Sequence, residues 1–295
     1  MKIVIGIPAF NEEKNIASII LKLKKSYPEI IVCDDGSSDM TGNIAKEMGV
    51  HVITHKKNQG YGGAISSIFR KASEINSDIL VTFDADGQHR VEDIQKVIEP
   101  LVNNEADFAI GSRFLNEPEN VPKYRKIGIK AITKITNSVS GGNVTDSQSG
   151  FRAYNKKILN SIQITESGMG VSTEILIKIQ KANFRIKEIP IIVLYEGDTS
   201  THNPISHGSS VILSTIKYIA IERPLIFYGI PGIVFLAIGL IFGAWTIQVF
   251  SNEGEVITNI ALVGIGGVIL GTVLIITATI LYSISSLIKS NKRND

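Results

Sequence analysis

The chain has 295 residues, a length that suggests one large domain or two structural units. Hydrophobic residues make up 44% and charged residues 20% of the sequence, which excludes small disulfide scaffolds, fibrous proteins and wholly disordered chains. The formal net charge of +2 lacks the basic excess of nucleic-acid-binding proteins, so we expect no nucleic acid as a partner. The single cysteine, Cys33, cannot form an internal disulfide, and we expect a small core residue rather than a nucleophile.

Residues 1–204 alternate short apolar runs with helical patterns. The sequence predicts strands in KIVIGIPAF, EIIVCDDGSSD, HVITHKK and DILVTFDADG. Between them it predicts helices over NEEKNIASIILKLKKS, capped by Asn11, and over TGNIAKEMG and GGAISSIFRKASEI. This alternation is typical of βαβ units, so we expect an α/β fold with a doubly wound, mostly parallel sheet. Such sheets bind ligands at the carboxyl ends of their strands.

The segment DADGQH directly follows a predicted buried strand. Asp84, Asp86 and the amide of Gln88 offer hard oxygen ligands on one side of a turn. Such ligands suit Mg²⁺ or Mn²⁺ that is also held by substrate phosphates. An Asp-x-Asp pair alone is a weak signal, because acidic residues often begin loops or cap helices, but its place at a strand end favours a metal site.

Polar residues also follow the first two predicted strands. Asp35 could accept hydrogen bonds from a base or a ribose, although an acidic residue in this turn also serves as a helix cap. After the first strand, Phe10 could stack on a base and Glu12 could bond to it. The glycine-rich loop NQGYGGA permits close backbone approach but is weak evidence by itself.

Two runs near the end of the chain, 225–250 and 256–288, contain no charged residue. Each is long enough to span the hydrocarbon core of a bilayer, which takes about 20 residues. We therefore expect a transmembrane hairpin within 224–295, the alternative being two buried core helices. Apolar residues at helical spacing over 205–223 predict an interfacial amphipathic helix, or else an ordinary helix packed on the globular part.

The charges that flank the two runs predict their orientation. The connecting loop carries only Glu253 and Glu255, whereas the outer ends carry basic residues: Lys217, Arg223, Lys289, Lys292 and Arg293. The positive-inside rule then places the globular part and the C-terminus in the cytoplasm, on a multi-pass protein of the cell membrane.

Seven motifs together resemble one known family. They are IPAFNEE, CDDGSSD, NQGYGGA, DADGQH, IGSRF, DSQSGFRAY and KEIPI, in this order from Met1 to about Pro190. The set resembles the GT-A fold glycosyltransferases of family 2, and within them the polyprenyl-phosphate (dolichol-phosphate) sugar synthases. The resemblance implies an inverting transfer of a sugar from a UDP- or GDP-linked donor to the phosphate of a dolichyl or polyprenyl lipid.

The resemblance also implies roles for individual residues. The donor nucleotide would contact eight positions: Pro8, Ala9, Phe10, Glu12, Cys33, Asp35, Asp84 and Ala85. Of these, Cys33 would contribute its backbone rather than its thiol. The metal would lie on Asp84, Asp86 and Gln88. Arg113 and Arg125 would hold the acceptor phosphate, and with Asp86 they would form the catalytic set.

Two departures from the family pattern concern substrate contacts. Ile129 stands where the family usually has a serine near the acceptor. After KEIPI, the expected arginine and lysine that contact the donor phosphates are replaced by a loop containing Glu196, Asp198 and His202. Either His202 and His207 supply the cationic role, or the loop serves another sugar.

Several alternatives stay open at this point. Asp146 and Ser149 shape either the acceptor side or a structural turn. A processive polysaccharide synthase is disfavoured, because the only tryptophan, Trp245, lies inside a membrane run. Another lipid acceptor or an inactive nucleotide-binding scaffold would be rivals, but the acceptor arginines and metal residues argue against them. Glycines at 264, 266, 267 and 271 permit close helix packing within the hairpin or in a homo-oligomer.

Overall fold

The structure is a computed structural model that describes residues 1–115, 121, 123–193, 216, 220, 221 and 223–291. It divides into two compact units, Met1–Thr215 and Ile216–Asp295. Most of the expected interfacial helix over 205–223 lies outside the described residues, as do His202 and His207.

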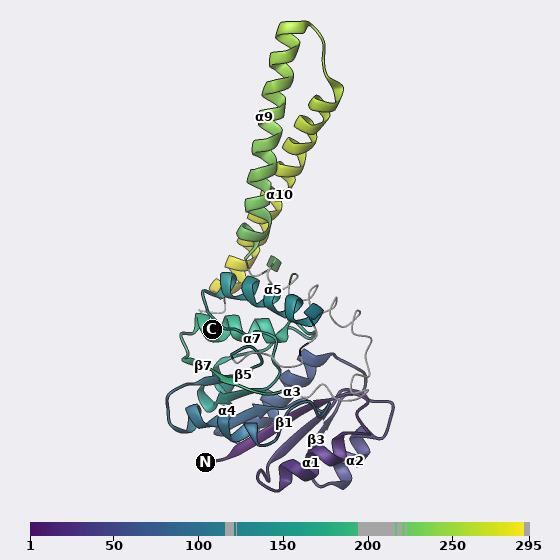
Figure 1. Ribbon diagram of the computed structural model, residues 1–295, viewed down its shortest axis with the longest axis vertical. Coiled ribbons are helices and arrows are strands. Elements are labelled where there is room, and N and C mark those ends of the chain that lie inside the picture. Colours follow the sequence, from purple (N-terminus) through teal and green to yellow (C-terminus); the bar gives the residue numbers. More distant parts are fainter. Residues whose placement is uncertain (116–120, 122, 194–215, 217–219, 222, 292–295) are drawn as a thin grey trace. The chain divides into compact units, whose positions relative to one another are not determined.

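The first unit is built on a seven-stranded sheet with the order β3-β2-β1-β4-β6-β5-β7. Figure 1 shows this sheet among its helices, with β1, β3, β5 and β7 labelled. The strands are β1 Ile3–Ala9, β2 Ile30–Asp34, β3 His51–Thr54, β4 Ile79–Thr82, β5 Phe108–Ser112, β6 Arg152–Asn155 and β7 Ile186–Pro190. The first four strands are parallel, as the alternating pattern predicts. Strand β6 runs antiparallel to both β4 and β5, so the sheet is mixed but mostly parallel.

Helices cover both faces of this sheet. They are α1 Ile16–Lys24, α2 Thr41–Glu47, α3 Tyr61–Glu74, α4 Asp93–Val102, α5 Lys123–Ser140, α6 Lys156–Ser161 and α7 Val171–Lys181. One buried apolar cluster joins the sheet to α1, α2 and α4, and a second joins it to α3, α6 and α7. The two clusters confirm the predicted doubly wound α/β fold.

The prediction that Asn11 caps the first helix is wrong. The helix α1 begins at Ile16, with Asn15 at its N-cap position. Asn11 has a φ of 56°, and its side-chain oxygen accepts a hydrogen bond from the Ser38 backbone N–H (2.9 Å). Asparagine tolerates this left-handed conformation, because its short polar side chain can bond to nearby groups. Asn11 therefore joins the turns that follow β1 and β2.

The second unit contains two long helices that are apolar enough to cross a membrane. A short π-helix, η1 Leu225–Gly229, leads into α9 Ile230–Glu253, and α10 Thr258–Asn291 follows. The candidate spans are Leu225–Glu253 and Thr258–Leu287, close to the predicted runs. Within the hairpin, Gly239 faces Gly267 so closely that a Cβ on Gly239 would lie 2.4 Å from a backbone nitrogen of α10. Glycine here lets the two helix backbones approach each other.

Candidate active site

The first two strands bring the predicted nucleoside residues together. Pro8 lies opposite Cys33 in the parallel register of β1 and β2, and the Asp35 N–H donates to the Ala9 carbonyl oxygen at 2.9 Å. Phe10 is half-buried just beyond β1, beside Glu12. The structure thus places these residues at one edge of the sheet, where its parallel strands end.

The carboxylate of Asp35 is held by groups of the protein itself. It is buried, and it accepts hydrogen bonds from the backbone N–H groups of Gln59 (2.9 Å) and Gly60 (2.8 Å). His55 Nδ1 lies 2.6 Å from Asp35 Oδ1. Asp35 therefore fixes the glycine-rich loop before α3. His55 was not predicted, because nothing in the sequence near it marks a partner 20 residues away.

Cys33 lies behind this loop and is inaccessible to solvent. Burial raises the pKa of its thiol to about 12. Its sulfur lies 3.7 Å from His55 Nε2, which is also 2.9 Å from Ser67 Oγ. A buried, protonated thiol is not a nucleophile at neutral pH, in agreement with the expectation of a core residue.

Asp84 and Asp86 occupy the turn that follows β4. The Tyr61 hydroxyl donates to Asp84 at 3.1 Å, and His89 Nε2 lies 3.4 Å from the other Asp84 oxygen. Burial by itself would raise the pKa of Asp84, but the contacts with His89 and Tyr61 and the charge of Arg113 lower it overall. Burial raises the pKa of Tyr61, so its hydroxyl stays a donor. Asp84 is therefore a carboxylate held in place on two sides.

The pKa of Asp86 is shifted in the opposite direction to that of Asp84. Burial and the neighbouring charge of Asp84 raise its pKa. The pKa of Glu12 is also raised, first by burial and then by the charges of Asp86, Asp39 and Asp84. Carboxylates that raise one another's pKa values mark a place where a cation would be stabilised. The donors present, carboxylate oxygens, are those preferred by Mg²⁺ and Mn²⁺.

The residues of this turn offer few ligands for a metal ion. In the described part of the chain, no group of three or more His, Cys, Asp or Glu side chains could hold an ion. Gln88 is half-buried, and its backbone N–H donates to Asp86 Oδ1 at 3.0 Å. A site of two carboxylates and an amide fits an ion that takes its remaining ligands from water and substrate phosphates.

His89 is a site residue that sequence reasoning did not single out. Its ring packs between Phe83 and Phe151, with centroids 5.8 and 5.1 Å away. Its Nε2 faces Asp84, while its buried Nδ1 has no hydrogen-bond partner among the described residues. This packing holds the ring in place, and the contact of its Nε2 with Asp84 then fixes the orientation of that carboxylate.

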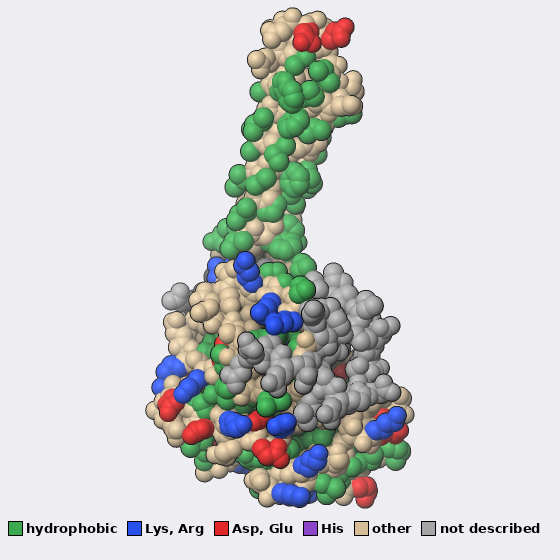
Figure 2. Space-filling model, in the orientation of Figure 1, with side chains coloured by type: hydrophobic (Ala, Val, Ile, Leu, Met, Phe, Trp, Pro, Cys, Tyr) green, Lys and Arg blue, Asp and Glu red, His purple; other side chains and the backbone are tan. Residues whose placement is uncertain are grey.

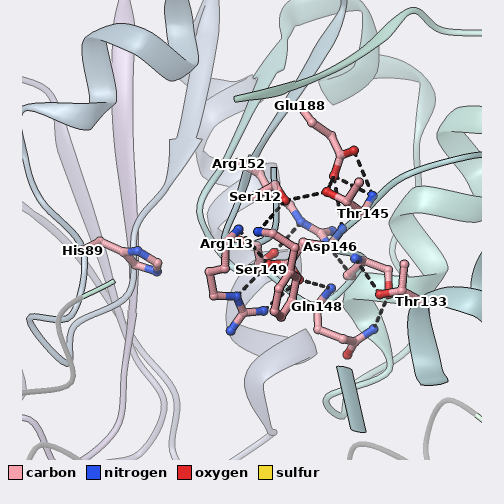
Figure 3. A network of polar contacts seen from close by, with 12 residues as sticks. His89, Ser112, Arg113, Thr133, Thr145, Asp146, Gln148, Ser149, Arg152 and Glu188 are labelled. Carbon is pink, nitrogen blue, oxygen red and sulfur yellow. Dashed lines mark hydrogen bonds and ion pairs between the residues drawn. The ribbon is translucent and has the colours of Figure 1, made fainter. Parts of the chain in front are cut away.

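Arg113 is held on the same side of the sheet by Asp146, which is fully buried (Figure 3). The guanidinium donates from Nε to Asp146 Oδ2 (2.6 Å) and from Nη2 to Oδ1 (2.8 Å). Burial opposes ionisation of Asp146, but the Arg113 charge and hydrogen bonds lower its pKa overall. The pair is a bidentate salt bridge, which fixes the direction of the guanidinium.

The loop that carries Asp146 is itself fixed by a glutamate of β7. Glu188 accepts hydrogen bonds from the backbone N–H groups of Thr145 (2.8 Å) and Asp146 (3.1 Å), as Figure 3 shows. Arg152, on β6, donates to the carbonyl oxygens of Ser149 and Ser147, both at 2.7 Å. DSQSGF is thus a structural turn whose hydrogen bonds also aim Arg113. Neither Arg152 nor Glu188 was predicted as part of this network.

Some predicted residues take no part in the geometry described above. Arg125 lies in the first turn of α5, but its side chain is outside the described part of the structure. Ile129 is half-buried on the same helix. Ala85 is buried between the two aspartates, so it can contribute only its backbone. The roles of these residues stay predictions.

The sequence and fold of this site match one family. The profile of Glycosyl transferase family 2 matches residues 4–163, more than half of the chain. The chain belongs to glycosyl transferase family 2. It is 38% identical over 229 residues to the UDP-N-acetylglucosamine–dolichyl-phosphate N-acetylglucosaminyltransferase of Methanococcus voltae, covering 70% of this chain and 89% of that protein. It is 30% identical to a dolichyl-phosphate hexose transferase of Haloferax volcanii, covering 72% of this chain and 92% of that protein.

A solved structure shows the same fold. Glucosyl-3-phosphoglycerate synthase from Mycobacterium tuberculosis, in complex with Mn²⁺, UDP and glucosyl-3-phosphoglycerate, superposes with a TM-score of 0.58. The sequences are 20% identical, and the match covers 73% of this chain and 79% of that one. Together with the family assignment, this confirms the predicted GT-A fold, and the family 2 chain is a glycosyltransferase.

Proposed function

We propose that this glycosyltransferase moves a sugar from a nucleoside diphosphate sugar to the phosphate of a dolichyl or polyprenyl lipid. The observation that carries the proposal is the pairing of two charge environments at one edge of the sheet. Asp84, Asp86 and Gln88 follow β4, where burial and the charge of Asp86 raise the pKa of Glu12, whereas the Arg113 guanidinium after β5 is fixed in direction by Asp146. A diphosphate with its metal ion suits the first environment, and an anionic acceptor suits the second.

The donor side would be formed by the ends of β1, β2 and β4. Asp84, Asp86 and Gln88 would hold a divalent metal ion, Mg²⁺ or Mn²⁺, which when bound stabilises negative charge on the leaving diphosphate. Tyr61 and His89 keep Asp84 oriented for this role. The loop fixed by Asp35 brings backbone close to the nucleotide, and Phe10 and Glu12 complete that side.

The acceptor side would be formed by Arg113 and Arg125. A phosphate monoester is already anionic near neutral pH, so the protein needs no general base to activate it. Its task is to place one phosphate oxygen against the anomeric carbon, and a guanidinium fixed by Asp146 performs such positioning. The described geometry therefore suits a phosphate better than a neutral hydroxyl, which would need a base.

For the donor, we propose a UDP-linked sugar. The relative from Methanococcus voltae is named for a UDP-N-acetylglucosamine donor, and the superposed synthase was crystallised with UDP. Other relatives are named as mannosyltransferases. Since the loop after KEIPI departs from the usual pattern, we place UDP-sugars ahead of GDP-mannose.

We propose that residues 1–204 form the catalytic domain, that 205–223 form an interfacial helix on the membrane, and that 224–295 form a membrane anchor with two spans. The two candidate spans and the basic residues outside them support an orientation with both ends in the cytoplasm. A lipid acceptor stays in the bilayer, so an anchored enzyme meets it without extracting it.

The test is sugar transfer by the full chain in detergent. The assay combines Mn²⁺ or Mg²⁺, a short polyprenyl phosphate and radiolabelled UDP- or GDP-sugars, and label is counted after organic extraction. We expect label in the lipid phase from one donor, lost on adding EDTA. The matched acceptor is the same polyprenol without its phosphate, for which we expect no label.

Other results would contradict the proposal in different ways. Transfer to polyprenol or diacylglycerol would indicate a hydroxyl acceptor. Release of nucleotide without label in the lipid would indicate a water-soluble acceptor. No turnover with any donor would favour an inactive nucleotide-binding scaffold.

A further inference from the structure

Glu174, on α7, is a buried acidic residue that has no part in the reaction proposed above. Figure 2 shows acidic side chains of the first unit on its surface, close to Lys and Arg side chains. Glu174 is instead inaccessible to solvent, and it is the only buried glutamate among the residues that the structure describes. A charge removed from water is costly unless other groups of the protein bind it. The partners of Glu174 therefore indicate what it holds in place.

These partners are the backbone of the segment 165–168 and one lysine. The Glu166 N–H donates to Glu174 Oε2 at 2.8 Å, and the Thr165 N–H donates to Oε1 at 2.9 Å. Lys178, one turn further along α7, donates to Oε1 at 2.6 Å. Both carboxylate oxygens of Glu174 are thus occupied, and they attach the backbone of the segment to α7.

The segment 165–168 packs directly against the beginning of α3. The Gly63 N–H donates to the Ser167 carbonyl oxygen at 3.2 Å. A Cβ on Gly62 would collide with the Glu166 carbonyl oxygen. Glycine at this position of the NQGYGGA loop therefore lets the two backbones touch. Because no side chain lies between them, a shift of the segment would also shift the first turn of α3.

The first residue of α3 is Tyr61, whose hydroxyl donates to Asp84 at 3.1 Å. The two groups are tightly enclosed, because a Cβ on Gly150 would lie 2.6 Å from Asp84 Oδ2 and 2.7 Å from the Tyr61 hydroxyl oxygen. A hydrogen bond weakens steeply as its angle closes, so a small rotation of this turn would weaken the contact. The orientation of the Asp84 carboxylate therefore depends on the position of the first turn of α3.

From these contacts we propose that Glu174 is a positioning residue for the metal site. It fixes the segment 165–168, the segment fixes the first turn of α3, and Tyr61 in that turn orients Asp84. Replacing a group that orients a metal ligand without touching the metal lowers metal affinity by about 10–100-fold. This role of Glu174 rests on the proposed function, in which Asp84 is a metal ligand.

The experiment measures binding of Mn²⁺ to the full chain in detergent, in the presence of UDP. The electron paramagnetic resonance signal of free Mn²⁺ weakens as the ion binds, so the dissociation constant is obtained without turnover. Glu174→Gln keeps the size of the side chain but leaves one acceptor oxygen instead of two, because an NH2 group cannot accept from an N–H. We expect the dissociation constant for Mn²⁺ to rise roughly tenfold, and Tyr61→Phe should raise it by the same factor.

Two comparisons separate positioning from a general loss of stability. If Glu174 acts through Tyr61, the double variant should also bind Mn²⁺ roughly tenfold more weakly than the parent, because the two changes interrupt the same chain of contacts. The matched control is Asp107→Asn, at the opposite end of the strands, where the carboxylate likewise accepts from a backbone N–H, that of Arg185 (3.0 Å). This control should lower the unfolding midpoint and leave the dissociation constant for Mn²⁺ unchanged.

A second variant tests the same contacts without changing a buried charge. Gly62→Ala places a methyl group against the Glu166 carbonyl oxygen and pushes the segment 165–168 away from α3. Thr165 and Ser167 are exposed, so the segment can shift without unfolding the core. We expect a loss of Mn²⁺ affinity similar to that of Glu174→Gln, and Gly62→Ala decides the result if Glu174→Gln does not fold.

Two kinds of result would overturn the proposal, and they differ. An unchanged dissociation constant in these variants, or a roughly hundredfold rise in the double variant, would mean that Glu174 does not act through Tyr61, while the proposed function stands. If the parent chain binds no Mn²⁺ in the presence of UDP, the proposed metal site is wrong and the role of Glu174 fails with it.

Discussion

The turn after β4 and the loop before β6 each bring an acidic residue, Asp86 and Asp146, to the candidate site. Folding shifts the pKa values of these two residues in opposite directions. Asp86, in the turn, has a raised pKa because burial and Asp84 both disfavour its charge. Asp146, in the loop, has a lowered pKa because Arg113 outweighs its complete burial. Arg113 supplies the counter-charge of Asp146, whereas burial and the charge of Asp84 outweigh the favourable contacts of Asp86. For these two residues, the raised pKa of Asp86 supports a role in binding a ligand, and the ion pair of Asp146 supports a role in positioning Arg113.

The largest effect on sugar transfer is expected from a change at Asp86. Asp86→Asn should lower sugar transfer by at least ~10²–10³-fold, because a lost metal ligand removes several kcal/mol of charge stabilisation. Without metal, its unfolding midpoint should stay equal or rise, since a carboxylate whose pKa is raised by folding destabilises the fold at neutral pH. A thiol-reactive fluorogenic dye reports the midpoint, because Cys33 becomes accessible only on unfolding.

The matched control for that variant is Glu92→Gln, which removes an exposed carboxylate just after the same turn. It should leave both transfer and the midpoint unchanged. Wild-type turnover by Asp86→Asn would disprove the assignment of this residue to the metal.

Breaking the ion pair between Asp146 and Arg113 should lower both sugar transfer and stability. Asp146→Asn breaks a bidentate salt bridge and leaves the half-buried Arg113 without its counter-charge, at a cost of about 3 kcal/mol. For a unit of this size that lowers the midpoint by roughly 6–12 °C. Transfer should also fall, with KM for the lipid phosphate rising, because the guanidinium is no longer aimed.

A double-mutant cycle with Arg113→Gln distinguishes pairing from independent effects. The two single variants and the double variant should lose nearly the same stability, which corresponds to strong coupling between the two residues. Additive losses would show that Asp146 and Arg113 act separately.

A smaller effect is expected one step further from the site. Glu188→Gln keeps the shape of the side chain but replaces one carboxylate oxygen by an NH2 group, which cannot accept a hydrogen bond, so the Thr145 and Asp146 N–H groups lose one of their two acceptor oxygens. The lost hydrogen bonds contribute about 1–2 kcal/mol, and the raised pKa of Glu188, caused by burial, offsets part of that loss, so we expect a smaller change in stability and a roughly tenfold fall in transfer. If kcat falls while KM for the lipid phosphate is unchanged, Glu188 does not act through Arg113.

The sequence predicts the half of the site that depends on local pattern. Apolar runs identify β1, β2, β3 and β4, and the structure confirms that Asp84 and Asp86 directly follow β4, while their role stays a prediction. The strands β5, β6 and β7 were not predicted, and in β6 Arg152 and Asn155 interrupt the apolar pattern. The partners Arg113 and Asp146 are 33 residues apart, and Asp35 and His55 are 20 apart. Such pairs form only when elements far apart in the sequence pack together, so no local sequence pattern predicts them.

The smallest effect concerns a charge pair at the opposite end of the strands from the site. Asp107, just before β5, accepts hydrogen bonds from Arg185 Nε (3.1 Å) and from the Arg185 N–H (3.0 Å), and this contact lowers its pKa. A lowered carboxyl pKa stabilises the fold above the unfolded value of about 3.9, and this contribution is lost as the pH falls through the lower, folded value. The midpoint of Asp107→Asn, followed by far-UV circular dichroism, should therefore be lower than that of the parent at pH 7 and approach it at acid pH. Glu105→Gln, which removes an exposed ion pair with Lys187, should show almost no difference at either pH. Sugar transfer should be unchanged in both variants, because neither residue lies near the candidate site. Equal midpoints for Asp107→Asn and the parent at pH 7 would mean that the ion pair contributes nothing to stability.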